Sequence, residues 1–125
     1  MKRKHHELIV WQESVDLVKE IYDLTANFPK EEIYSLTNQI RRSAISVPSN
    51  IAEGAARATD KEFINFLSIS RGSLSELETQ IIIASKIGYI NNTEQMMKKI
   101  DKIFALINGL INSIKMRDNA PRSET

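Results

Sequence analysis

The residues best placed for chemistry in this 125-residue chain lie in one segment, from Gln39 to Arg57. Apolar residues recur there at helical spacing, so the polar residues between them project mainly from the other side of one helix. Arginine presents a planar fork of N–H donors that suits phosphate and carboxylate groups. The segment therefore predicts a charged ridge that contacts the phosphates of RNA or DNA, or that joins subunits. The candidate residues of this arginine ridge, one of them from a later segment, are Arg41, Arg42, Asn50, Glu53, Arg57 and Arg71.

Within the arginine ridge, we assign the arginines to phosphate contacts or to the subunit interface, and Asn50 and Glu53 to orienting them. An alternative is that the arginines only form ion pairs across helices with Glu53, Glu76 or Glu78, as bundle surfaces often do. The two interpretations are compatible, because a ridge of paired charges can also be an interface. A second basic group is expected to be a solvated face of the last helix: Lys98, Lys99, Lys102, Lys115 and Arg117.

The stretch from Ser46 to Gly54 also loosely resembles the recognition helix of a helix-turn-helix protein. In that arrangement Ser49 and Asn50 would enter a major groove of DNA. The apolar stripe argues against it, because it continues through the expected turn without a change of phase.

No arrangement of side chains predicts catalysis, so we expect no catalytic residue, no cofactor and no metal site. The chain has no cysteine, and its only histidines, His5 and His6, are adjacent near the N-terminus. A di-iron bundle needs Glu-x-x-His motifs on two helices, and a nucleophilic serine needs a histidine base. An enzyme that uses Glu53 with Arg42 is kept as a minor alternative.

Two further groups of residues are assigned to packing. The aromatic residues are not interleaved with bases as a stacking platform for single strands requires, so we expect them to pack: Trp11, Tyr22, Tyr34 and Tyr89. Small residues are expected where helices approach closely: Ala52, Gly54, Ala55, Gly72 and Ser73. Replacement of Gly72 by leucine is then expected to overpack such a contact.

Apolar stripes at helical spacing predict the first two helices that position these residues. The first helix is expected over about 10–27, ended by Phe28-Pro29, because a residue before proline is disfavoured in a helix. The second is expected to start with Pro29 in its first turn and to carry a stripe from Ile33 to Ala55. Pro48 lies within this stripe, whose unbroken phase favours one kinked helix over two.

The last two helices have recognisable ends. Thr59 and Glu62 have the spacing of a capping box, which starts the third helix, and Gly88 is placed to end it. The fourth helix is expected to begin near the capping residues Asn91-Asn92-Thr93. It carries the most regular apolar stripe of the chain, which runs to Ile114.

Four amphipathic helices with short connections indicate an all-α fold, an antiparallel up-down-up-down four-helix bundle. Residues 8–117 are expected to form this domain, between a frayed N-terminus (1–7) and a disordered tail (118–125). Residues 11–29 hold one base and four acids, and residues 91–117 hold five bases and two acids. This asymmetry favours pairing of the first helix with the last, and it equally allows one face to remain basic for a polyanion. No signal peptide or membrane span is predicted, so we expect a cytoplasmic protein with no membrane partner.

Several motifs in one order resemble a known family. They are Leu8-Ile-Val-Trp-Gln12, Phe28-Pro29, the segment from Gln39 to Gly54, Gly72-Ser-Leu-Ser-Glu-Leu-Glu78 and Ile87-Gly-Tyr89. The chain resembles the four-helix bundle proteins of the 23S rRNA intervening-sequence family from about residue 8 to 114. The resemblance implies a four-helix bundle without known catalysis.

The family is in turn similar to the accessory proteins of diversity-generating retroelements, which form pentameric rings that bind nucleic acid and a reverse transcriptase. This likeness implies a homo-oligomer and suggests a homopentamer. The accessory proteins are strongly basic, whereas this chain has a net charge of only +1. We therefore expect a non-enzymatic, oligomeric protein that binds structured RNA or DNA through the repeated arginine ridge. The alternative is a protein–protein interaction scaffold with no nucleic-acid role.

Overall fold

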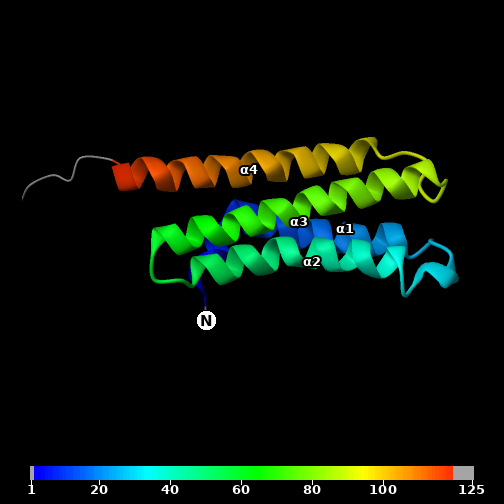
Figure 1. Ribbon diagram of the computed structural model, residues 1–125, viewed down its shortest axis with the longest axis horizontal. Coiled ribbons are helices and arrows are strands. Elements are labelled where there is room, and N and C mark those ends of the chain that lie inside the picture. The colour runs from blue at the N-terminus through cyan, green and yellow to red at the C-terminus, as the bar shows by residue number, and fades with distance from the viewer. Residues whose placement is uncertain (1, 120–125) are drawn as a thin grey trace, which may run out of the picture.

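Four α-helices form the body of the protein in a computed structural model that describes residues 2–119. The helices are α1 (Ile9–Thr25), α2 (Leu36–Ala55), α3 (Asp60–Lys86) and α4 (Glu94–Asn119). They lie alongside one another (Figure 1), and α1 and α3 each pack against both α2 and α4. No strand occurs in residues 2–119, so the all-α class predicted from the sequence is confirmed.

One hydrophobic core runs between the helices. The stripe predicted on α2 is buried there, and Ile40, Ala44, Val47 and Ile51 are all fully shielded from solvent. The other three helices contribute side chains at the same three- and four-residue spacing, which places them on one face of each helix. The largest of these fully buried side chains are Leu17, Ile21, Leu67, Leu74, Leu77, Ile81, Ile100, Ile103, Ile107 and Ile114.

The second helix starts later than its stripe predicts. A separate 3-10 turn, η2 (Lys30–Glu32), follows Pro29, and α2 begins only at Leu36. Ile33, the first member of the predicted stripe, is 44% exposed. The expectation of a helix that continues from Pro29 is therefore wrong, because the tight turn rotates Ile33 out of the phase of α2. Pro48 lies inside α2, as the continuous interpretation requires.

The ends of α3 are formed as the sequence predicts. The Thr59 Oγ1 accepts a hydrogen bond from the Glu62 backbone N–H at 3.2 Å, and the Thr59 hydroxyl donates to the Glu62 carboxylate at 3.1 Å. Gly88 follows the helix with a φ of 91°, a left-handed conformation that glycine adopts without steric cost. The backbone N–H of Tyr89 then donates to the carbonyl of Ala84 at 2.9 Å.

The acidic first helix and the basic last helix pair, as their charges predict. Lys102 Nζ lies 2.9 Å from a carboxylate oxygen of Glu13, and Lys99 Nζ lies 3.4 Å from the other oxygen. Lys99 also lies 3.7 Å from Glu20. The hydrogen bond from Lys102 is the main cause that lowers the pKa of Glu13 below its ordinary value.

The chain ends are more regular than expected. Residues 1–7 were assigned to a frayed terminus, yet Lys4–Glu7 forms a 3-10 helix, η1, that contacts α1 and α2. Helix α4 continues to Asn119, two residues into the expected tail of 118–125. The rest of that tail lies outside the described residues.

The close helix contact lies at Gly54 and not at Gly72. A Cβ atom added to Gly54 would lie 2.7 Å from Phe66 Cβ and 3.2 Å from the carbonyl oxygen of Phe63, so α2 and α3 can approach there only with glycine. Nothing lies within 4 Å of a Cβ built on Gly72. The expectation that Gly72 marks a close contact, and that leucine would overpack it, is therefore wrong, because Gly72 faces solvent.

Candidate functional site

The arginine ridge predicted from the sequence is divided among three places in the fold. Arg41 lies between α2 and α1, where its Nε donates a hydrogen bond to Thr25 Oγ1 at 2.9 Å. Its guanidinium carbon is 4.5 Å from the centre of the Tyr22 ring, a cation–π contact. The arginine is thus held on its Nε side, and among residues 2–119 its terminal amino groups have no ion-pair partner.

Arg42 projects from the next position of α2 and is exposed. It forms no hydrogen bond or ion pair within the described part of the chain. Arg42 lines a cavity of about 380 Å³ together with Arg41, Tyr34 and Asn38. Two cationic groups therefore lie near an aromatic ring at the N-terminal half of α2.

Arg57 and Glu53 lie at the opposite end of α2. Their side chains form an ion pair of 2.7 Å, and the Arg57 guanidinium stacks over Phe66 at 4.8 Å. Glu53 thus orients an arginine, as predicted. This pair is the one case in the described residues in which an arginine of the ridge binds one of the three proposed acids, and it lies within one segment and not across helices.

Arg71 and Asn50 have other partners than predicted. Arg71 of α3 donates to Asn108 Oδ1 of α4 at 2.7 Å, so it faces a different pair of helices from Arg41. The Asn50 amide donates to the carbonyl and hydroxyl oxygens of Ser46, at 2.8 and 2.9 Å, and neither bond involves an arginine. The predicted ridge therefore does not include Arg41 and Arg71, because Arg41 faces α1 and Arg71 projects from α3 toward α4.

The helix-turn-helix alternative is excluded by the continuity of α2. Residues Ser46 to Gly54 lie inside one helix of 20 residues, with no turn before Ser49. Ser46 accepts or donates a hydrogen bond of 2.8 Å with Ser73 of α3, so this part of α2 faces a neighbouring helix.

Of the four aromatic residues that were expected to pack, Tyr34 is the most exposed to solvent. Its side chain is 92% exposed, whereas Tyr89 is half-buried and packs against Phe28 at 5.4 Å between ring centres. Tyr34 lies after η2 and before α2, where no helix covers it. It lines the same cavities as Arg42.

Two residues that sequence reasoning missed lie beside these groups. Thr37 is buried, and its hydroxyl oxygen has no hydrogen-bond partner; the same is true of the Gln80 amide oxygen. Thr37 lines the cavity of Arg41 and Arg42, and Gln80 lines the adjoining cavity with Tyr34. The signal for Thr37 was available, because a polar residue three positions before Ile40 lies on the core face of α2.

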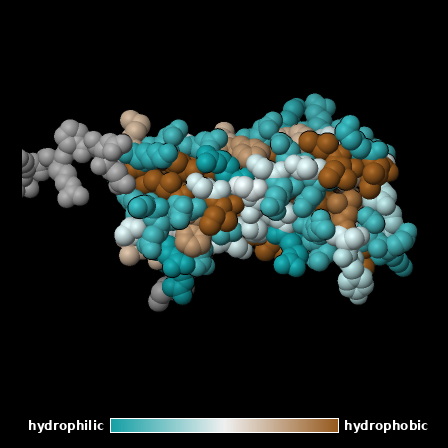
Figure 2. All heavy atoms as spheres, viewed as in Figure 1, coloured by the Kyte–Doolittle hydropathy of each residue, from teal (hydrophilic) through white to brown (hydrophobic). Residues whose placement is uncertain are grey.

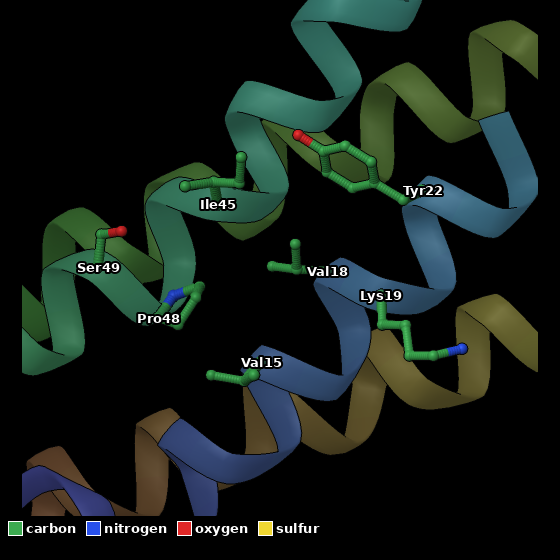
Figure 3. Close-up of a pocket in the computed structure, with 7 residues that line it drawn as sticks. All are labelled: Val15, Val18, Lys19, Tyr22, Ile45, Pro48 and Ser49. Carbon is green, nitrogen blue, oxygen red and sulfur yellow. The ribbon is translucent and has the colours of Figure 1, made fainter. Parts of the chain in front are cut away.

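An apolar groove separates α1 from α2 beside these cavities (Figure 3). Val15 and Val18 of α1 face Ile45 and Pro48 of α2 across it, while the Lys19 side chain points away (Figure 3). The groove has a volume of about 500 Å³, and Val15 and Ile45 are each 40% exposed. Such an apolar surface is suited to contact with another protein segment.

Other exposed hydrophobic residues are scattered over the surface. On the face seen in Figure 2, hydrophobic residues lie in separate groups among hydrophilic ones. Helix α3 contributes three exposed isoleucines, Ile69, Ile82 and Ile83, and the exposed Ile87 directly follows it.

The histidines at the N-terminus pack as an aromatic group. The rings of His5 and His6 lie 5.0 and 5.2 Å from that of Trp11, and desolvation, followed by the charge of His6, lowers the pKa of His5. In residues 2–119 no group of three or more histidine, cysteine or acidic side chains is arranged to hold a metal ion. Within the same residues, none of the helices combines the length and apolar character needed to cross a membrane.

Comparisons with known proteins show a similar fold and a matching family. A crystal structure of a protein with unknown function from the S23 ribosomal protein family of Bacteroides thetaiotaomicron VPI-5482 is similar, with a TM-score of 0.77 and 24% sequence identity. The similarity covers 83% of this chain and 96% of that chain, and at this identity it supports the fold alone. A search of curated proteins gave no match. The model of the 23S rRNA-intervening sequence proteins matches residues 6–109, and the chain therefore belongs to that family.

Proposed function

We propose that this chain is a non-enzymatic binding protein that contacts structured RNA or DNA through the surface around Arg41, Arg42 and Tyr34. The observation that carries the proposal is the exposed Tyr34 ring beside two arginines that have no acidic partner among residues 2–119. Arginine binds phosphate groups, and an exposed aromatic ring stacks on an unpaired base. Arg57 and Arg71, which have partners of their own, are left out of this surface.

In this proposal the protein acts as a homo-oligomer, because one such surface is small. A net charge of +1 provides little attraction for a polyanion, whereas a ring of identical subunits repeats the same contact several times. The likeness to the retroelement accessory proteins favours a pentamer. An antiparallel up-down-up-down order of the helices is supported by Figure 1, in which the colour gradient reverses from each helix to the next. A cytoplasmic location is part of the same proposal.

The first experiment measures fluorescence anisotropy of labelled RNA and DNA at several salt concentrations, with light scattering to determine the mass of the protein. Binding through phosphate contacts weakens steeply as salt rises. The variant Arg42→Glu is expected to lose most of this binding, and Lys115→Glu provides the matched charge reversal on α4. Equal binding by the two variants would contradict the proposed surface.

A protein–protein interaction scaffold is the second candidate, and the apolar groove between α1 and α2 favours it. An interface in that groove would depend on buried apolar area, so its affinity would change little with salt. Absence of nucleic-acid binding at low salt, from a protein of unchanged oligomeric mass, would make the scaffold the better account.

A further inference from the structure

A cavity at the N-terminal end of α2 is lined by Lys30, Thr37 and Arg41, whose side chains can donate hydrogen bonds. Its volume is about 300 Å³, and Thr37 and Arg41 line both this cavity and the neighbouring one of about 380 Å³. The N–H groups in the first turn of any α-helix lack partners within the helix. In α2, Ser35 supplies no side-chain cap to these groups, and the first turn has no acidic residue.

The Thr37 hydroxyl is an independent sign of a ligand at this place. Thr37 is only 2% exposed, and its Oγ1 has no hydrogen-bond partner. A buried hydroxyl without a hydrogen-bond partner destabilises the fold, so native proteins rarely retain one. The cost is removed when a bound group in the cavity accepts the hydroxyl hydrogen.

The charges around the cavity favour an anion. Lys30 and Arg41 contribute the ionised side chains of its wall, and no carboxylate lines this cavity or its neighbour. Arg41 is anchored through its Nε on Thr25, which leaves its two terminal amino groups for a ligand. The remaining wall is mostly apolar and includes Phe28 and Pro29.

We propose that this cavity binds one phosphate group, held by Lys30, Thr37, Arg41 and the first-turn N–H groups of α2. A phosphate has more acceptor oxygens and more charge than a carboxylate, and it therefore uses more of the donors in this set. The phosphate is supplied either by the end of a nucleic-acid strand or by free phosphate. Of these two sources, only the strand end depends on the function proposed above.

The test is calorimetric titration of the full chain with inorganic phosphate at constant ionic strength. Thr37→Val keeps the shape of the side chain and removes the hydroxyl, so it should lower phosphate affinity about tenfold. The same variant should keep or raise the melting temperature without phosphate, because it removes the unpartnered hydroxyl. Thr79→Val, at an exposed position of α3, is the matched control and should bind phosphate as the wild type does.

Lys30→Gln is a second variant, and because Lys30 is exposed the fold should tolerate it. It should weaken phosphate binding several-fold with no change in the melting temperature. Absence of phosphate binding by the wild type, or equal affinity in the wild type and in Thr37→Val, would overturn the proposed site.

The source of the phosphate is distinguished by a second titration, with one oligonucleotide prepared with and without a 5′-phosphate. Tighter binding of the phosphorylated form, lost in Thr37→Val, assigns the cavity to a strand end. Phosphate binding without any oligonucleotide binding keeps the cavity as a free-phosphate site and contradicts the function proposed above. Oligonucleotide binding that free phosphate and Thr37→Val leave unchanged supports that function and rules out a strand end as the source of the phosphate.

Discussion

Glycines that lie inside helices can have opposite roles in one fold. Gly54 and Gly72 both lie inside helices, and both are expected from the sequence at close helix contacts, but only Gly54 lies at one. The difference arises from the partner helix, because Phe63 and Phe66 of α3 cover Gly54, whereas Gly72 faces solvent.

Gly54→Ala is therefore expected to lower the free energy of unfolding by about 1–3 kcal/mol, because the added Cβ displaces α3. Gly72→Ala is expected to raise it by about 0.5–1 kcal/mol, since alanine is the better helix former. Urea denaturation of both variants measures this difference. Equal effects of the two substitutions would show that α2 and α3 do not meet closely at Gly54.

Each helix is specified by its ends as much as by its stripe. The Thr59 cap fixes the start of α3 through local bonds to Glu62, which is why the sequence predicts it correctly. The start of α2 has no such cap, and a 3-10 turn and three connecting residues lie between Pro29 and Leu36. The cavity beside Thr37 and Arg41 lies where this connection between Pro29 and Leu36 meets the start of α2.

Thr59→Ala should destabilise the protein by about 1 kcal/mol, because it leaves the Glu62 N–H without its acceptor. The matched control is Thr79→Ala in the middle of α3, where the threonine hydroxyl bonds only to the Ser75 carbonyl of its own helix. That variant should be neutral or slightly stabilising, since alanine has the higher helix propensity. Thermal denaturation compares the two, and a Thr59→Ala variant as stable as the control would rule out the cap.

Contact between the first and last helices completes the four-helix arrangement. Glu13 of α1 lies between Lys99 and Lys102 of α4, and these bonds lower the pKa of Glu13. A carboxylate whose pKa is lower in the folded than in the unfolded state stabilises the fold above its unfolded pKa. This stabilisation is lost as the pH falls through the folded value.

Glu13→Gln should therefore be less stable than the wild type at neutral pH, and the difference should shrink as the pH is lowered below the ordinary range for glutamate. Urea denaturation across this pH range provides the measurement. Glu31→Gln, which removes an exposed carboxylate that has no ion pair among residues 2–119, is the control. A constant difference between Glu13→Gln and the wild type at all pH values would contradict the role of these ion pairs.

The sequence by itself determined the all-α class, the buried stripes, the caps of α3 and the pairing of α1 with α4. The fold class, the stripes and the caps follow from periodicity and local hydrogen bonds, which depend on residues close together in the chain. The pairing of α1 with α4 follows from the opposite net charges of the two helices. Tertiary structure alone decided that Arg41 and Arg71 face different helices, that Tyr34 is exposed and that Gly72, unlike Gly54, faces solvent. The physical reason is that neighbouring positions of a helix point to different partners, and only packing determines which partner each one meets.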